Sequence, residues 1–157
     1  MDFIFKKLLS NPKRFFDILP QDWQDEIVPF WSAYEDSSSI YIIEEKDQII
    51  GGGIVFSTCP PDIEYYSKEA QQWFDKDYLY LGFIFILENK RDQNLGTFWL
   101  DELKTLFPKQ KYWLLMEDED LHRFYQKNAF MLNQTIGNNH LERVYIFKPL
   151  TDYISNT

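Results

Sequence analysis

Cysteine and histidine are scarce in this chain, and their scarcity excludes two kinds of site. Cys59 is the only cysteine among 157 residues, so the chain cannot form an internal disulfide. The two histidines, His122 and His140, lie far apart in the sequence and have no cysteine nearby, which gives no recognisable metal-ligand spacing. We therefore expect a reduced interior and no bound metal.

Basic residues and long apolar runs are also few. The chain has 16 Lys and Arg against 25 Asp and Glu, a formal net charge of −9, so long-range forces would repel nucleic acid and anionic lipid. No apolar run approaches the ~20 residues that a membrane helix needs. Residues 1–7 do not have the order of a secretory signal. The sequence predicts a cytoplasmic protein that binds neither nucleic acid nor membrane.

Aromatic residues, by contrast, are abundant, since Phe, Trp and Tyr make up 18% of the chain. Each buried ring adds about 150–250 Å² to a core, and a chain of this length buries roughly two-thirds of its unfolded surface. We expect one domain over residues 1–157. Its parts are a helical N-terminal segment, residues 1–38, and a sheet with the functional core, residues 39–157.

The N-terminal segment is predicted to hold two helices. Ser10 or Asn11 can cap the first, which has Pro12 in its first turn. In the second, aromatic and aliphatic residues recur at helical spacing from Trp23 onward, and Pro29 can kink it.

The rest of the chain alternates strands and helices. Gly51, Gly52 and Gly53 lie inside a predicted strand, where glycine marks a bulge or a close approach by another group. The last two strands flank a turn at Gly137-Asn138-Asn139. Strands are predicted over residues 40–43, 49–56, 78–87, 111–116, 130–136 and 141–147, and a short helix that Ser67 can cap runs through Phe74.

This order of elements predicts a mixed α/β fold. The central sheet is expected to be parallel in its middle and antiparallel at its hairpins, with helices on both faces. Ligands of such sheets bind at the carboxyl ends of the central strands. Strand 78–87 has such an end, and the segment from Arg91 to Gly96 connects it to an amphipathic helix. A turn rich in backbone donors at a helix N-terminus is a predicted phosphate cradle.

The order of these parts resembles the GNAT superfamily of acyl-CoA-dependent N-acetyltransferases. In that family a strand leads to Arg or Gln, two residues, Gly, one residue, and Gly or Ala at the start of a helix. Arg91 and Gly96 match this motif, and Asn94 stands at its first glycine position. A later motif of the family is matched by Tyr125, Lys127 and Phe130, with Ala129 where glycine is usual. The resemblance covers residues 40–147 and implies the GNAT fold.

The resemblance implies acetyl-CoA as co-substrate and no metal. Ile86 and Leu87 would pair their backbone groups with the pantetheine arm where the strand separates from its neighbour. Asp118 stands where the family often has an Asn that contacts the cofactor, although a plain helix cap explains it equally well. The pyrophosphate would be bound by Arg91 and by backbone N–H groups of Gln93, Asn94, Leu95, Gly96 and Thr97.

The resemblance also implies a mechanism in which a neutral primary amine attacks the thioester directly. Tyr125 would protonate the departing thiolate, since the ordinary pKa of tyrosine, about 10, lies a little above that of a thiol, about 8.5. A backbone N–H near Leu87 would stabilise the developing oxyanion. The general base stays open, with Glu88 and Glu117 as candidates that could act through water. Cys59 is expected to fill space rather than to react.

The acceptor is a small-molecule or peptide amine that the sequence does not identify. Residues 59–76, with Tyr65, Tyr66, Trp73 and Phe74, and the N-terminal helices would line the side opposite the cofactor, and acidic residues there would favour a cationic amine. A homodimer stays open. Two other functions also stay open: a GNAT-like protein that binds acyl-CoA without catalysis, and a small protein-interaction domain.

Overall fold

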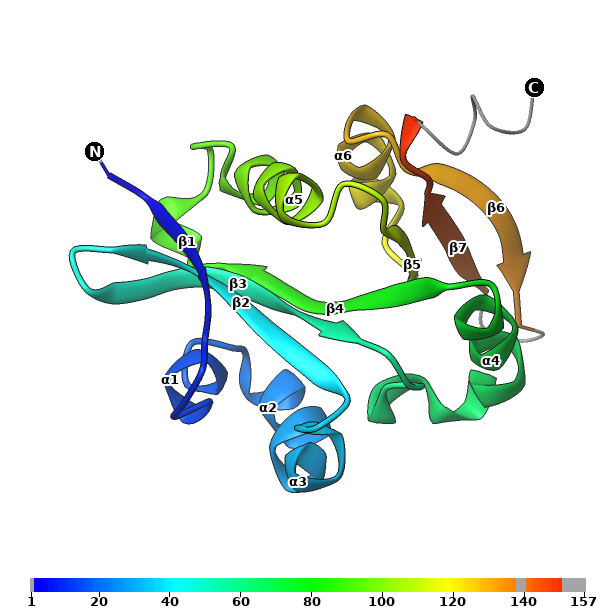
Figure 1. The fold of residues 1–157 in the computed structure, drawn as a ribbon, viewed down its shortest axis with the longest axis horizontal. Helices are drawn as coiled ribbons and strands as arrows, with labels where there is room; N and C mark the ends of the chain where they lie inside the picture. The colour runs from blue at the N-terminus through cyan, green and yellow to red at the C-terminus, as the bar shows by residue number, and fades with distance from the viewer. Residues whose placement is uncertain (1, 138–140, 151–157) are drawn as a thin grey trace.

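The computed structural model describes residues 2–137 and 141–150, in which seven strands form one sheet in the order β1-β2-β3-β4-β5-β7-β6 (Figure 1). The strands are β1 Ile4–Lys7, β2 Ser38–Glu45, β3 Gln48–Phe56, β4 Tyr78–Ile86, β5 Lys111–Met116, β6 Met131–Ile136 and β7 Glu142–Phe147. The α-helices are α1 Lys13–Phe16, α2 Gln21–Ile27, α3 Trp31–Tyr34, α4 Ser67–Asp75, α5 Leu95–Leu106 and α6 His122–Lys127. Short 3-10 helices are η1 Val28–Phe30, η2 Pro61–Tyr66, η3 Glu88–Lys90 and η4 Glu119–Leu121.

The sheet is mixed, as the sequence predicts. Strands β4 and β5 pair in parallel, and every other described pair of neighbouring strands is antiparallel. Helices α5 and α6 cover one face, and α1 to α4 lie on the other (Figure 1). The predicted fold class is therefore confirmed, and the strand over 111–116 has the predicted bounds.

The first strand was not predicted, because residues 1–38 read as helical from their pattern. Strand β1 pairs antiparallel with β2, with Phe5 opposite Ile43. The Phe5 ring stacks on Tyr41 at 5.5 Å and meets Trp99 edge-on at 6.3 Å. A strand of four residues with a mostly exposed pattern has too little periodicity to read. Its conformation is fixed by the sheet edge and by these aromatic contacts.

The N-terminal helices follow the prediction, whereas the capping predictions for α1 and α4 fail. Pro29 lies in η1, which breaks the helical segment between α2 and α3, as the kink prediction required. Neither Ser10 nor Asn11 caps α1, where Pro12 holds the N-cap position and no side chain bonds to the helix end. Asn11 instead takes a left-handed conformation with φ 52°. Ser67 begins α4 without a capping hydrogen bond, so that capping prediction was also wrong.

The glycines of β3 are explained by close approach. A Cβ on Gly52 would lie 2.6 Å from the carbonyl oxygen of Tyr41, and one on Gly53 would lie 2.8 Å from the Trp99 ring. The pairing of β3 with β4 also shifts register between Gly52 and Ile54. The close approach of other groups therefore explains these glycines, and the bulge lies on the facing strand, β4.

The register shift places an extra residue on β4. Phe83, in the middle of that strand, has φ 53°, a left-handed conformation that is rare for a bulky residue. Its ring is held between Phe56 and Trp23. Because a bulge bends its strand and increases the local twist, β4 turns away from β5 beyond this point.

The closing hairpin of β6 and β7 is present, and the predicted turn residues Asn138 and Asn139, like His140, lie outside the described residues. Within the described ranges, no helix is long and apolar enough to cross a membrane.

Candidate active site

The two central strands separate at their carboxyl ends. Parallel pairing joins only Tyr78 to Lys111, Leu79 to Tyr112 and Tyr80 to Trp113, although β4 continues to Ile86 and β5 to Met116. The bulge at Phe83 lies just past the last pair. The strands therefore open into a wedge with unpaired backbone on its inner edges.

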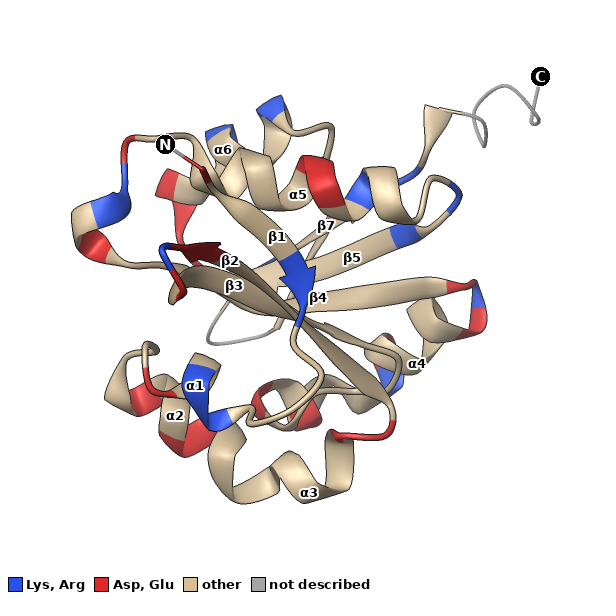
Figure 2. Cartoon of the chain, turned by 60° about the vertical axis from the view of Figure 1, so that its left-hand side comes forward, with Lys and Arg blue, Asp and Glu red and all other residues tan. Residues whose placement is uncertain are grey.

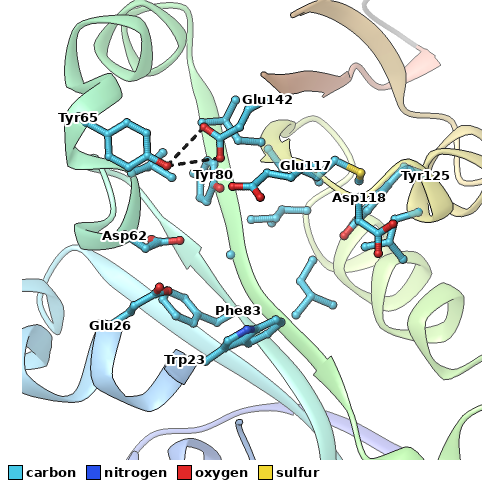
Figure 3. Close-up of a pocket in the computed structure, with 18 residues that line it drawn as sticks. Trp23, Glu26, Asp62, Tyr65, Tyr80, Phe83, Glu117, Asp118, Tyr125 and Glu142 are labelled. Carbon is cyan, nitrogen blue, oxygen red and sulfur yellow. Dashed lines mark hydrogen bonds between the residues drawn. The ribbon is translucent and has the colours of Figure 1, made fainter. Parts of the chain in front are cut away.

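A pocket of about 520 Å³ occupies this wedge and reaches both faces of the sheet. Figure 3 shows Tyr65, Asp62 and Glu26 on one side of β4 and Asp118 and Tyr125 on the other. The pocket is lined by Trp23 and Glu26 of α2, Asp62, Ile63 and Tyr65 of η2, residues 80–84 of β4, residues 114–118 at the end of β5, Leu121 of η4, Tyr125 of α6 and Glu142 of β7.

Tyr125 lies in this pocket and is only 7% exposed. Its ring packs against Phe124, Phe130 and Tyr145. Burial raises the pKa of Tyr125 well above its ordinary value, because the phenolate would lose its hydration. The side chain is therefore a protonated phenol at neutral pH and can donate a proton into the wedge.

The turn before α5 has the geometry of an anion cradle. Asn94 adopts the left-handed conformation, φ 57°, and no side chain within the described chain caps the helix. Phe98 N–H is the first to bond to a backbone carbonyl at this end, that of Asn94 at 2.9 Å, which leaves the N–H groups of Leu95, Gly96 and Thr97 without an intrahelical acceptor. This end of α5 therefore fits a phosphate group.

Gly96 is required here by packing against α6. A Cβ at this position would lie 2.9 Å from the Phe124 ring. The helices are also joined by the Asn128 side chain, which donates to Thr97 Oγ1 at 3.2 Å and to the Phe124 carbonyl at 2.8 Å. The two motifs that are distant in the sequence thus meet, with the Tyr125 helix beside the cradle.

The end of β4 differs in one respect from the expected backbone arrangement. Leu87 N–H donates to the Ile50 carbonyl of β3 at 2.9 Å, so it faces away from the wedge and cannot be the oxyanion donor. Successive residues of a strand point their backbone groups to opposite sides, which turns those of Ile86 toward β5. Arg91 Nε donates to the Ile86 carbonyl at 3.1 Å and lies over the Phe85 ring.

Asp118 caps a helix, which is one of the two roles that the sequence allowed for it. Its Oδ1 accepts from Asp120 N–H at 2.9 Å at the start of η4. It also lines the pocket, together with Glu117, whereas the other candidate base, Glu88, lies in η3 and is not among the residues that line it.

The acceptor side of the pocket holds residues that sequence reasoning missed. Trp23, Glu26, Asp62 and Glu142 come from three separate elements, and no local spacing connects them. Of the aromatic residues predicted on this side within residues 59–76, Tyr65 lines the pocket, whereas Tyr66, Trp73 and Phe74 do not. The signals were the aromatic and acidic composition of residues 59–76 and the expectation that the N-terminal helices line this side, as α2 does.

Other residues of that segment serve the core. Trp73 and Phe74 pack on Trp113 at 6.2 and 5.8 Å between ring centres. Burial raises the pKa of the Cys59 thiol to about 11, with Asp62 and Glu64 adding to the shift, so the reactive thiolate is disfavoured, in line with its predicted role as a filler.

Among the described residues, no group of three or more His, Cys, Asp and Glu side chains is placed to hold a metal ion.

A wedge between two parallel central strands with a helix N-terminus beside it is the arrangement that the sequence resemblance implied for an acyl-CoA-dependent transferase. The profile of the acetyltransferase (GNAT) family matches residues 6–130. The chain therefore belongs to the GNAT acetyltransferase family.

Solved structures agree on the fold at low identity. A GNAT acetyltransferase from Elizabethkingia anophelis with acetyl-CoA bound shares 13% identity, with a TM-score of 0.63 over 93% of this chain and 97% of that one. A Bacillus subtilis acetyltransferase in complex with CoA shares 12%, with a TM-score of 0.62 over 95% and 100%. An acetyltransferase from Streptococcus agalactiae shares 15%, with a TM-score of 0.63 over 93% and 98%. Among curated proteins, none matches this sequence.

Ala129 provides a stability test of the second motif. It has φ 70°, a region in which the Cβ of alanine is strained and glycine is not. We expect Ala129→Gly to raise the free energy of unfolding by up to about 1 kcal/mol, measured by urea denaturation. The same change at Ala33, inside α3, should lower it by about 0.5–1 kcal/mol. A loss of stability in Ala129→Gly would show that the left-handed conformation does not carry this cost.

Proposed function

We propose that this GNAT acetyltransferase moves an acetyl group from acetyl-CoA to a primary amine by direct attack within the wedge between β4 and β5. The observation that carries the proposal is the meeting of three features. These are the uncapped N-terminus of α5, which packs on α6 through Gly96, the unpaired inner edge of β4, and the buried phenol of Tyr125 of α6 in the pocket. The acetyl-CoA and CoA complexes of the similar structures support the choice of donor.

The residues present fit acetyl-CoA. The N–H groups at the start of α5 would hold the pyrophosphate at the positive end of the helix, with Gln93 and Asn94 forming the turn and Arg91 supplying a cation. Ile86 would offer its backbone N–H to a pantetheine amide, since its carbonyl accepts from Arg91, while Leu87 keeps its N–H on β3. Asp118 lines the pocket beside them. The bound thioester supplies the activated acetyl group.

Tyr125 would donate the proton that the departing sulfur requires. Its pKa is raised by burial, so it starts protonated, and the thiolate in the same pocket is also poorly hydrated. Proton transfer from the phenol then neutralises the sulfur without leaving two anions.

The two residues that depart from the family motifs do not favour the alternative function, a GNAT-like protein that binds acyl-CoA without catalysis. Asn94 and Ala129 stand at glycine positions, and both take the left-handed conformation that glycine adopts readily. The backbone of the cradle is therefore formed with Asn94 in place.

Arg91→Ala tests the cradle. Loss of one cation beside a pyrophosphate should raise the Kd for acetyl-CoA about tenfold, because a hydrogen bond to a charged group contributes on the order of 1.5–3 kcal/mol. Isothermal titration calorimetry measures the change. Lys109→Ala, which removes a cation beyond the opposite end of α5, is the control and should keep the wild-type Kd. Equal affinity of Arg91→Ala and wild type would remove Arg91 from the cradle.

A further inference from the structure

The acceptor half of the pocket is strongly acidic. Glu26 comes from α2, Asp62 from η2 and Glu142 from β7, and Glu117 follows β5. Among the described residues that line the pocket, none is Lys, Arg or His. Figure 2 shows acidic residues on α2, on the face of the sheet that also carries α1 and α3. A cavity with this lining binds cations and repels anions.

Among the carboxyls that line the pocket, Asp62 has one oxygen that the described part of the protein leaves without a hydrogen-bond partner. Its Oδ1 is buried and has no hydrogen-bond partner among residues 2–137 and 141–150. The side chain points into the pocket (Figure 3). A buried acceptor without a partner costs about 1–3 kcal/mol, so the Asp62 carboxylate gains from a cationic donor that binds in the pocket beside it.

Glu142 is a second carboxyl, held in place by the protein. It is 5% exposed, and the Tyr65 hydroxyl donates to both of its oxygens at 3.4 Å. Glu142 and Glu26 lie close enough to Asp62 to raise its pKa. The pocket thus presents carboxyls from three elements, α2, η2 and β7, so its charge suits an acceptor with two or more positive groups.

Aromatic side chains form the wall beside these carboxyls. The Trp23 indole meets the rings of Phe83 and Phe85 edge-on at 6.1 and 5.7 Å, and Trp23 and Phe83 both line the pocket. Aromatic faces favour organic cations and the methylene chains between them. The bulge that opens the strands thus also places Phe83 on the acceptor wall.

Building on the proposed function, we propose that Asp62 binds the reacting ammonium of the acceptor and takes its proton, while Glu26 and Glu142, on either side of Asp62, attract the further positive groups of the acceptor (Figure 3). The acceptor class is therefore a small aliphatic diamine or polyamine.

The protons balance in this scheme. Asp62, as carboxylate, accepts one proton from the ammonium and releases it to solvent. The neutral nitrogen forms a bond with the acetyl carbon, and the bond from that carbon to sulfur breaks, its electron pair leaving with sulfur. Tyr125 gives sulfur its proton and recovers one from the nitrogen, which keeps its last hydrogen in the amide. One ammonium and one thioester thus yield one amide, one thiol and one proton.

The scheme sets a pH dependence for kcat/KM. Burial, with Glu26 and Glu142 nearby, raises the pKa of Asp62 to about 7, so the accepting carboxylate forms as pH rises through that value. Other titratable groups that interact with Asp62 are Tyr34, Cys59 and Tyr80, and the pKa of each is raised, so they stay protonated over this range. A rise in kcat/KM near pH 7 that is lost in Asp62→Asn is therefore assigned to Asp62 in the free enzyme, because Glu26, whose pKa burial also raises, is still present in that variant.

The test compares 1,4-diaminobutane with butylamine in the full-length protein. Thiol release with acetyl-CoA should give a kcat/KM at least about tenfold higher for the diamine, since close charge pairs contribute that much or more. Asp62→Asn should lower kcat for the diamine about 100-fold and abolish the rise near pH 7. Its Kd for acetyl-CoA should stay at the wild-type value. Asp36→Asn, an exposed surface carboxyl, is the matched control and should keep wild-type kinetics.

A second variant and a binding measurement separate this inference from the proposed function. Glu26→Gln, at an exposed position that folding tolerates, should reduce the preference for the diamine over butylamine. Calorimetry of 1,4-diaminobutane with the protein alone should show binding that Asp62→Asn weakens at least tenfold. Acetyl transfer to butylamine as efficient as to the diamine, or wild-type kcat in Asp62→Asn, would overturn the inference while leaving acetyl transfer intact. Absence of transfer to every amine would overturn the proposed function instead, and absence of diamine binding by calorimetry would overturn the inference independently.

Discussion

Tyr125→Phe is expected to lower kcat for acetyl transfer by about 100-fold or more, the usual contribution of a positioned general acid. The ring should keep its packing against Phe124, Phe130 and Tyr145, because only the hydroxyl is removed. The Kd for acetyl-CoA should therefore change little. Without the phenol, the sulfur must leave as a thiolate in a pocket that hydrates it poorly, so the loss falls on turnover.

Tyr112→Phe is the matched control for this variant. Tyr112 is a buried tyrosine of β5 whose hydroxyl has no hydrogen-bond partner among the described residues, and it does not line the pocket. Its removal should leave kcat at the wild-type value. Pre-steady-state thiol release, followed with a colorimetric thiol reagent, measures both variants. If Tyr125→Phe turns over at the wild-type rate, the proton comes from another group and Tyr125 is only a packing residue.

Trp99→Ala is expected to have the largest effect on stability, a loss of about 3–5 kcal/mol in the free energy of unfolding. Trp99 is fully buried on α5, lies over Gly53, and donates its indole N–H to the Tyr41 carbonyl at 3.0 Å. The change empties the space between α5 and β2–β3 and leaves that carbonyl without this donor. Because the same helix presents the cradle at its N-terminus, affinity for acetyl-CoA should fall as well.

Leu106→Ala, on the same helix, is the control for that loss. Leu106 is 53% exposed, so its truncation should cost less than about 1 kcal/mol. Urea denaturation followed by tryptophan fluorescence compares Leu106→Ala with wild type, and far-ultraviolet circular dichroism is used for Trp99→Ala because a fluorophore is lost. A cost for Trp99→Ala no larger than that for Leu106→Ala would mean that α5 is not anchored through this indole.

The elements that the sequence predicted are those with strong local signals. Residues 112–116 of β5 are a continuous apolar run, and the helix after Gly96 has a clear apolar face, so each element was found near its observed bounds. Asn94 stands at a glycine position of the family motif and takes the left-handed conformation, which Asn tolerates better than most residues. The cradle side of the site depends on such local features and was therefore predictable.

What the sequence did not predict depends on contacts between distant segments. Strand β1 exists because β2 offers it an edge, and the register shift at Phe83 is set by its pairing with β3 and by the rings around it. The direction of Leu87 N–H follows from that register. Asp62 and Glu142 are 80 positions apart and meet only through the folded sheet. The acceptor side therefore required the structure.

The most direct test of the central claim is to incubate the protein with acetyl-CoA and a panel of primary amines, and to measure free thiol and acetylated amine together by mass spectrometry. The account predicts equal amounts of CoA and N-acetylated amine, with 1,4-diaminobutane among the best acceptors and with both products strongly reduced in Tyr125→Phe. Thiol release without any acetylated amine, or no release across the whole panel, would contradict acetyl transfer in the wedge between β4 and β5.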